Sequence, residues 1–227
     1  MKLKVCGNKY NPLEVAAEGP DLLGFIFWEG SPRNVVADLP EGMPEAPGRV
    51  GVFVDAEPEF IRKTSRQYAL SHIQLHGNES PEYCCRLREL LAAAPGDLPL
   101  HLIKAFAVGP GFDFKALQAY RSCCDYFLFD SRGPLPGGNG TAFDWTLLEA
   151  YPYDTPYFLS GGIAPESVSA LSSFLEQPVA RHCYALDVNS KFETGPGLKD
   201  TDRLRNFMAS PLFGTGLAKP SNTLNHE

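Results

Sequence analysis

Short apolar runs alternate along the chain with segments whose apolar residues recur at helical spacing. The apolar runs predict strands at 2–5, 22–27, 50–54, 72–75, 100–106, 126–129, 157–159 and 185–188. The segments between them predict helices at 12–17, 58–68, 81–93, 113–120, 144–150, 165–174 and 201–208. Several of these helices begin with a proline in the first turn, as at Pro12, Pro81 and Pro165. The connection at 29–47 is rich in proline and glycine, so we expect a weak or very short helix there.

Repeated strand-and-helix units are typical of an α/β protein with a parallel sheet. Eight predicted strands in 227 residues favour a single (β/α)8 TIM barrel with a parallel eight-stranded core over an open, doubly wound sheet. The open sheet would carry a Gly-x-Gly-x-x-Gly turn after the first strand, and Cys6-Gly7-Asn8-Lys9-Tyr10 is not such a turn. We expect the catalytic barrel domain to span 1–209 and a polar, disordered tail to span 210–227.

Composition narrows the class of protein further. A formal net charge of −7 disfavours nucleic-acid binding, which depends on clustered Lys and Arg. No signal peptide and no apolar run of membrane length is present, so we expect no membrane association. The cysteines, including the adjacent pairs at 84–85 and 123–124, are interpreted as free thiols in a reducing cytoplasm. Because no Cys-x-x-Cys or His-x-x-x-His spacing occurs, we expect no metal.

The active face of such a barrel lies at the carboxyl ends of its strands. Cys6 ends the first predicted strand, and Gly7 after it allows close approach of a substrate. A cationic or imine-bearing substrate would lower the thiol pKa towards the range of a general base, although a free cysteine is more often a small buried apolar residue. Asp130 ends an apolar strand, where a carboxylate is solvated, paired or functional. Its structural alternative is an ion pair with Arg132 or Lys104.

Loops of small residues after the late strands favour a phosphate site, because exposed amides bind oxyanions. The alternative is that the glycines only permit tight turns. The candidates for this site are Gly138, Gly140, Gly161, Gly162, Asn189 and Ser190.

Five further polar residues lie at strand ends, in the middle of a strand (Lys104) or in a loop (Arg33). Arg33 is positioned to bind a carboxylate with both arms of its guanidinium, unless it is simply solvated. Gln74 and His76 are candidate ligand contacts, and His76 is equally compatible with a structural hydrogen bond. We expect Lys104 to point into the barrel as a buried, paired residue, and Asp187 to cap the turn that follows it.

Taken together and in order, these pieces resemble the phosphoribosylanthranilate isomerase family of tryptophan biosynthesis. The resemblance rests on Lys4-Val5-Cys6-Gly7, Gly24-Phe25-Ile26-Phe27, Ser31-Pro32-Arg33, Val50-Gly51-Val52-Phe53-Val54, Ile73-Gln74-Leu75-His76-Gly77, Leu102-Ile103-Lys104-Ala105, Asp130, Gly137-Gly138-Asn139-Gly140, Phe143-Asp144-Trp145, Leu159-Ser160-Gly161-Gly162-Ile163, Asp187-Val188-Asn189-Ser190, Glu193, Pro196-Gly197 and Lys199-Asp200.

The resemblance implies an aldose–ketose isomerase that rearranges N-(5-phosphoribosyl)anthranilate to the 1-deoxyribulose 5-phosphate aminoketose. It implies that Cys6 is the general base, Asp130 the general acid and Arg33 the partner of the anthranilate carboxylate. It implies no cofactor: neither metal, flavin nor nicotinamide is required. Thr141 stands where many family members have lysine, and the loop around Glu29 is rearranged.

We expect a small phosphorylated substrate and a monomer or weak homodimer. Two other functions stay open. One is another phosphate-binding barrel isomerase, although the histidine-pathway isomerase relies on two aspartates, and here the first strand ends in Cys6. The other is a catalytically silent phosphate-binding barrel that acts as a partner module, a reading that the pairing of Cys6 with Asp130 disfavours.

Overall fold

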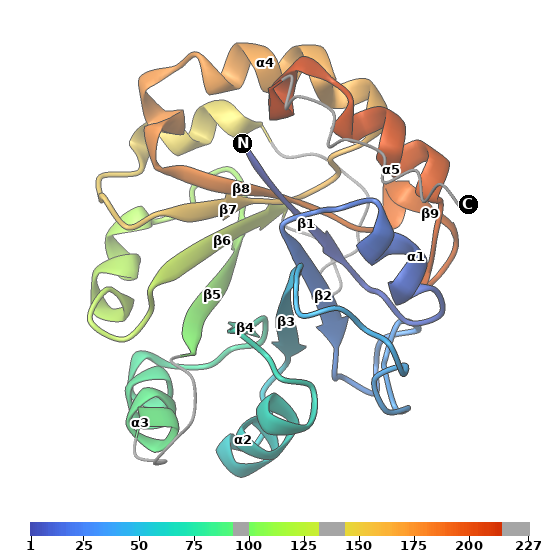
Figure 1. Cartoon of the computed structure of the whole chain (residues 1–227). Coiled ribbons are helices and arrows are strands. Elements are labelled where there is room, and N and C mark those ends of the chain that lie inside the picture. Colours follow the sequence, from blue (N-terminus) through green and yellow to red (C-terminus); the bar gives the residue numbers. More distant parts are fainter. Residues whose placement is uncertain (93–99, 132–143, 215–227) are drawn as a thin grey trace.

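Eight parallel strands close into a barrel in chain order, with β1 paired to both β2 and β8 (Figure 1). The computed structural model describes residues 1–92, 100–131 and 144–214. The strands are β1 (Lys2–Cys6), β2 (Leu22–Ile26), β3 (Gly48–Phe53), β4 (His72–Leu75), β5 (His101–Val108), β6 (Tyr126–Ser131), β7 (Tyr157–Leu159) and β8 (Cys183–Val188). This confirms the predicted (β/α)8 architecture, with eight of the sixteen strand boundaries moved by one or two residues.

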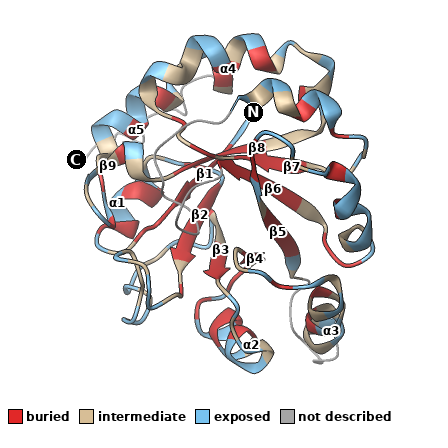
Figure 2. Ribbon diagram, turned by 180° about the vertical axis from the view of Figure 1, so that it is seen from behind, coloured by how far each residue is buried: buried red, intermediate tan, exposed pale blue. Residues whose placement is uncertain are grey.

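The helices surround the barrel and bury one face each against the strands (Figure 2). They are α1 (Pro12–Ala17), α2 (Pro58–Gln67), α3 (Pro81–Ala92), α4 (Val168–Leu175) and α5 (Thr201–Met208). Short 3-10 helices are η1 (Phe114–Tyr120), η2 (Trp145–Ala150), η3 (Pro165–Ser167), η4 (Pro178–His182), η5 (Ser190–Phe192) and η6 (Pro211–Phe213). Among these described helices, none combines the length and apolarity that a bilayer crossing needs.

Two predicted α-helices are 3-10 helices instead, η1 and η2. Each begins after an aspartate, Asp113 or Asp144, whose carboxylate accepts a hydrogen bond at 3.0 Å from the backbone N–H two residues later. Such short-range side-chain bonds favour a tight turn over a full α-helical turn.

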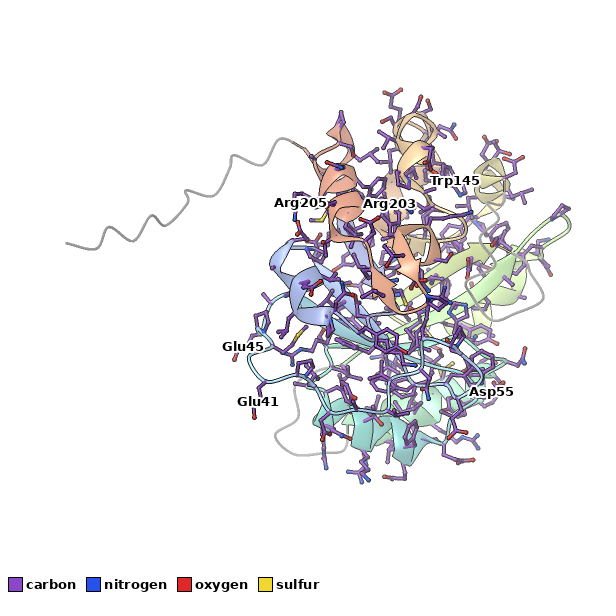
Figure 3. All side chains as sticks on the ribbon, turned by 90° about the vertical axis from the view of Figure 1, so that its right-hand side faces the viewer. Glu41, Glu45, Asp55, Trp145, Arg203 and Arg205 are labelled. Carbon is purple, nitrogen blue, oxygen red and sulfur yellow. A yellow bond between two sulfur atoms is a disulfide. The ribbon has the colours of Figure 1, made fainter. Side chains whose placement is uncertain are left out.

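The connection between β2 and β3 contains no helix, which agrees with its proline and glycine content. Its only strand-like feature is a single bridge between Ile26 and Asn34. Glu41 and Glu45 in this connection point away from the molecule in Figure 3, and both are exposed. After β8 the chain forms a small antiparallel pair, β9 (Glu193–Gly195) and β10 (Leu198–Lys199), which the sequence did not predict.

The apolar core has two parts, separated by the wall of the barrel. The inner part draws on six different strands and therefore lies inside the barrel; it contains Leu22, Val50, Ile103, Ala105, Leu128, Phe158 and Ala185. The outer part lies between strands and helices and includes Phe127 and Phe129, the two neighbours of Leu128. Because side chains alternate along a strand, Asp130 points into the barrel with Leu128.

Lys104 points in the opposite direction from our prediction. It lies between Ile103 and Ala105, which both face the barrel interior, so its own side chain lies outside. There its Nζ is 3.1 Å from Oε2 of Glu79, and both side chains are almost fully buried. The prediction of a buried, paired lysine is confirmed. The predicted inward direction is wrong, because the two neighbours of Lys104 face the barrel interior and Lys104 faces the helices.

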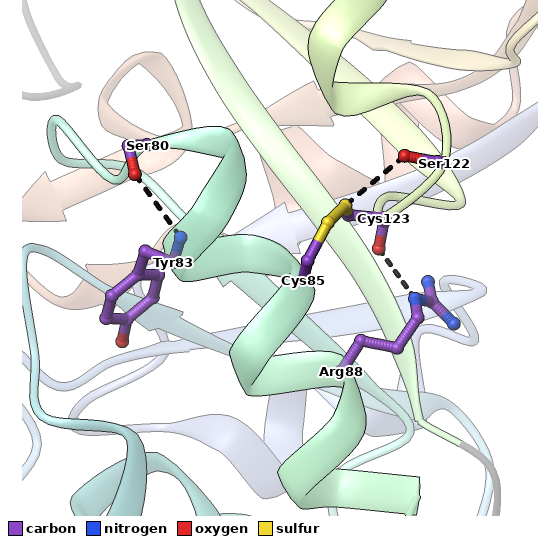
Figure 4. Close-up of a disulfide and its surroundings, with 6 residues drawn as sticks. All are labelled: Ser80, Tyr83, Cys85, Arg88, Ser122 and Cys123. Carbon is purple, nitrogen blue, oxygen red and sulfur yellow. Dashed lines mark hydrogen bonds between the residues drawn. A yellow bond between two sulfur atoms is a disulfide. The ribbon is translucent and has the colours of Figure 1, made fainter.

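The cysteines are not all free thiols, which corrects a second prediction. Cys85 of α3 is joined to Cys123 by a disulfide with a Cα–Cα distance of 4.9 Å, as Figure 4 shows. Arg88 supports the bridged segment, because its Nε donates to the carbonyl oxygen of Cys123 at 2.6 Å. The bridge joins residues 38 positions apart, one from each adjacent pair. The remaining four cysteines, Cys6 among them, are free.

Candidate active site

A pocket of about 60 Å³ opens at the carboxyl ends of the strands. Its lining combines the predicted chemistry with apolar walls: Cys6, Ile26, Trp28, Ser31, Arg33, Val52, Val54, Gln74, His76, Asp130, Ser160, Asp187 and Asn189. Two larger hollows, of about 530 and 510 Å³, lie elsewhere on the described surface. Neither brings a thiol and a carboxyl together, so chemistry rather than size identifies the site.

Cys6 reaches the pocket from the end of β1 and is 4% exposed. Two glycines keep space open here, Gly24 for Cys6 itself and Gly7 for Asn189 beside it. A Cβ on Gly24 would lie 2.9 Å from the Cys6 sulfur, and a Cβ on Gly7 would lie 2.6 Å from Oδ1 of Asn189. Gly7 also has a φ of +78°, which side chains rarely adopt. Burial raises the pKa of the Cys6 thiol above its ordinary value of 9.0, while the ammonium groups of Lys4 and Lys199 act to lower it.

Asp130 enters the same pocket from β6 and is 6% exposed. Its Oδ1 accepts a hydrogen bond from the backbone N–H of Ser131 at 2.8 Å, and its Oδ2 is 3.5 Å from Nε2 of His76. The expected structural alternative of a pair with Lys104 is wrong, because Lys104 lies outside the barrel with Glu79. Residue 132, the other proposed partner, lies outside the described residues.

A buried polar network lies beneath the pocket. The ammonium of Lys4, 0% exposed, is 2.9 Å from Oδ1 of Asp187 and 2.7 Å from Oε1 of Gln74. Burial by itself lowers the Lys4 pKa, but the Asp187 carboxylate and Cys6 outweigh it and raise this pKa above 10.5. Nε2 of Gln74 is in turn 2.7 Å from Nδ1 of His76. Our expectation that Asp187 caps the following turn is therefore wrong, because its carboxylate faces Lys4 inside the barrel.

Arg33 lines the pocket, as predicted, and it is already bound to an acidic side chain. Its Nε is 2.9 Å from Oε1 of Glu193 and its Nη2 is 2.7 Å from Oε2. Lys199 also donates to Oε1 of Glu193 at 2.7 Å and to Oδ1 of Asn189 at 2.8 Å. Burial favours the protonated form of Glu193, but the bonds from Arg33 and Lys199 hold its pKa below 4.5. Glu193 therefore fixes one edge of the guanidinium, and Nη1 has no hydrogen-bond partner among the described residues.

The loops after β7 and β8 carry several of the predicted phosphate contacts. Gly161 and Gly162 have φ values of +86° and +68°, a backbone conformation that suits glycine. No described residue accepts a hydrogen bond from the backbone amides of these two glycines. Asn189, beside the pocket, uses its Oδ1 for Lys199 and begins η5, whose first residue is Ser190. The other two candidates, Gly138 and Gly140, lie outside the described residues.

Sequence reasoning placed Cys6 and Asp130 in the site but did not assign roles to Lys4, Glu193 and Lys199. Lys4 could have been found from the alternation alone, because it lies two residues before Cys6 on the same strand and face. Glu193 and Lys199 lie on β9 and β10, a pair too short to give a hydrophobic pattern.

The fold and these side chains define a class: a (β/α)8-barrel enzyme with a thiol and a carboxyl facing one pocket at the strand ends. Comparison with known proteins identifies the family within this class. The family described as N-(5'phosphoribosyl)anthranilate (PRA) isomerase matches residues 3–210, and the chain belongs to this family.

Individual relatives agree with that assignment. A curated N-(5'-phosphoribosyl)anthranilate isomerase of Parabacteroides distasonis is 41% identical, with 99% of this chain and 100% of the relative covered. The crystal structure of phosphoribosyl anthranilate isomerase from Thermotoga maritima is 32% identical and covers 92% of this chain and 97% of its own, with a TM-score of 0.73. A further solved structure, 31% identical, covers the same shares with a TM-score of 0.71, and is described as a complex with reduced 1-(o-carboxyphenylamino)-1-deoxyribulose 5-phosphate.

Proposed function

We propose that Cys6 is the general base and Asp130 the general acid with which this chain isomerises N-(5'-phosphoribosyl)anthranilate to 1-(2-carboxyphenylamino)-1-deoxyribulose 5-phosphate in tryptophan biosynthesis. The isomerisation itself follows from family membership. The observation that supports the assignment of roles is that the two groups reach one small pocket from β1 and β6. A reaction that needs one proton delivered and one removed requires such a pair.

Asp130 acts first. Its carboxyl proton passes to the ring oxygen of the furanose, and the bond from that oxygen to C1 breaks. The nitrogen lone pair forms a C1–N double bond, which gives an iminium ion. The carboxylate left on Asp130 then has a donor near each oxygen, the N–H of Ser131 at 2.8 Å and Nε2 of His76 at 3.5 Å. Such preorganised donors stabilise the charge that develops as the proton leaves.

Cys6 acts second, as a thiolate. It removes the proton from C2, and the electrons of that bond form a C1–C2 double bond while the iminium nitrogen becomes neutral. The resulting enolamine takes up a proton at C1 as its C2 hydroxyl loses one, which gives the ketone. One carbon is reduced as its neighbour is oxidised, so the reaction as written needs no external electron acceptor.

Substrate binding is assigned to the rest of the pocket. We assign the anthranilate carboxylate to Arg33, whose Nη1 is the free edge of a guanidinium held by Glu193. Gln74 and His76 line the wall between Cys6 and Asp130. The phosphate is assigned to the amides and small side chains of Gly161, Gly162, Asn189 and Ser190, together with Gly138 and Gly140. The complex of a related barrel with a reduced, phosphorylated ligand of the same skeleton supports a phosphorylated ligand for this pocket.

The decisive experiment follows anthranilate fluorescence after the protein is added to freshly made substrate. Cys6→Ser removes a thiolate and leaves a hydroxyl of much higher pKa, so we expect kcat to fall by about 10²–10⁴-fold. Asp130→Asn keeps the shape and loses the proton, so we expect a similar fall in kcat with a smaller change in KM. Both variants should still bind product. Near wild-type turnover in either variant would remove that residue from its assigned role.

Three broader assignments accompany this function. We propose that residues 1–209 form the catalytic unit and 210–227 a C-terminal tail. The described part of this tail, 210–214, contains η6, whose Leu212 is buried in the outer part of the core. We further propose a cytoplasmic location and a monomer or weak homodimer. Sedimentation at several protein concentrations tests the last of these.

A further inference from the structure

The acid and base proposed above leave a buried cation beneath the pocket without a role. Lys4 is 0% exposed, lies two residues before Cys6 and therefore projects from the same face of β1. Its ammonium donates to Oδ1 of Asp187 at 2.9 Å and to Oε1 of Gln74 at 2.7 Å, and its charge lowers the pKa of the neighbouring Cys6 thiol. Burying an ammonium is costly, so its retention at this place points to a role.

The chemistry of the donors fixes the direction of each bond in the network. An ammonium only donates, so the atom of Gln74 that faces Lys4 must be the amide oxygen. The NH2 group of Gln74 then faces Nδ1 of His76 at 2.7 Å, and that nitrogen must accept. The remaining ring hydrogen of His76 is therefore on Nε2, the atom 3.5 Å from Oδ2 of Asp130.

The same ammonium thus acts on both ends of the pocket. On one side its charge favours the Cys6 thiolate. On the other side it sets, through one amide, which nitrogen of His76 presents a hydrogen to Asp130. In the opposite tautomer the lone pair of Nε2 would face Oδ2 and repel the carboxylate that the acid step produces.

We propose that Lys4 is a positioning residue of the isomerisation, whose ammonium lies beside Cys6 on the same face of β1 and orients His76 towards Asp130 through Gln74. The proposal rests on the roles assigned to Cys6 and Asp130. It adds a physical link between the base and the acid, because one buried cation prepares both.

Gln74→Glu tests the arm towards Asp130. Glutamate has nearly the same shape as glutamine and still accepts from Lys4, but it has no hydrogen to donate to His76. We expect the His76 ring to carry its hydrogen on Nδ1 in this variant and on Nε2 in the wild type. Ring-nitrogen NMR on protein with isotope-labelled histidine distinguishes the two without any substrate. We expect kcat to fall by about 10- to 100-fold, with a smaller change in KM.

The double variant Lys4→Met/Asp187→Asn tests the arm towards Cys6, and it removes both buried charges together so that neither is left unpaired. The charged and titratable groups that face Cys6 are Lys4 on its own strand, Asp187 from β8, Lys199 from β10, and Arg33, His76 and Asp130 across the pocket. Lys4 lowers the thiol pKa more than Asp187 raises it. Alkylation of the Cys6 peptide, followed by mass spectrometry across pH, should therefore require higher pH in this variant.

Arg88→Met/Asp125→Asn is the control, because it neutralises an ion pair outside the barrel, and Asp125 precedes β6 at the end of the strands opposite the pocket. We expect it to leave the His76 tautomer and the Cys6 alkylation profile unchanged. A wild-type tautomer in Gln74→Glu, or a wild-type alkylation profile in Lys4→Met/Asp187→Asn, would overturn the proposal. So would unchanged kcat in both variants. In that last case, an inactive Cys6→Ser places the error with Lys4, and an active one places it with the proposed base.

If Lys4→Met/Asp187→Asn does not fold, Gln74→Glu alone decides, because it keeps the ion pair of Lys4 with Asp187.

Discussion

His72 makes the stability of the barrel dependent on pH. It begins β4, is 7% exposed, and points into the barrel. Its Nδ1 is 2.9 Å from Oγ of Ser71, whereas its buried Nε2 has no hydrogen-bond partner among the described residues. The ring of His101 lies 5.0 Å away, centroid to centroid. Burial, followed by the charges of His101 and Lys4, lowers the pKa of His72 from 6.5 to about 4.

The size and sign of the effect follow from that difference. One pKa unit corresponds to about 1.4 kcal/mol, so a shift from 6.5 to about 4 is worth about 3 kcal/mol. The folded-state pKa is the lower one, so between the two values the unfolded chain binds more protons than the folded protein. The contribution of His72 is therefore fully present above pH 6.5 and is lost as the pH falls through about 4.

The assay is urea unfolding by circular dichroism at a series of pH values, with wild type compared to His72→Asn. Asparagine keeps an acceptor for Ser71 and cannot take up a proton. The variant is less stable at neutral pH because it leaves a cavity, but its free energy of unfolding should fall less on acidification. We expect the gap between the two proteins to narrow by about 3 kcal/mol from about pH 7 to about pH 4. His182→Asn, at a partly exposed position, controls for the loss of any histidine. Parallel curves for wild type and His72→Asn would refute the reasoning.

Three further predictions concern binding and the disulfide. Arg33→Lys loses the forked geometry with which a guanidinium binds a carboxylate. In steady-state kinetics, KM should therefore rise by about 10- to 100-fold with a smaller loss of kcat. An unchanged KM would remove Arg33 from the carboxylate site. Gly161→Ala strains a residue at φ +86° and should weaken inhibition by inorganic phosphate about tenfold, whereas Gly214→Ala, at φ +69° away from the pocket, should not; equal inhibition in both would contradict the phosphate assignment. Cys123→Ser removes the disulfide to Cys85, which links residues 38 positions apart. In urea unfolding without reductant, the free energy of unfolding should fall by about 4 kcal/mol. The same loss with reductant would mean that packing, not the disulfide, is responsible.

The sequence correctly predicted the residues whose position depends only on where a strand ends. Cys6 and Asp130 each end an apolar run, and a parallel barrel brings all such ends to one face. Lys104 was misplaced because a strand of uniformly buried residues carries no polar alternation to show which side faces inward. The bridge of Cys85 to Cys123 could not be predicted, because it depends on the closed barrel placing α3 beside the turn that follows η1.

The barrel interior changes character along its axis, and this change explains how so many charges are tolerated near the pocket. Asp130 lies two residues beyond Leu128, and Asp187 lies two residues beyond Ala185, so each acid lies directly above an apolar residue of the inner core. The apolar part excludes water, which strengthens every electrostatic interaction above it. A lone charge there would destabilise the fold. Lys4 is instead paired with Asp187 and also donates to Gln74. Burying these polar groups costs stability, and that cost falls in the layer of the barrel where Lys4 can act on both Cys6 and Asp130.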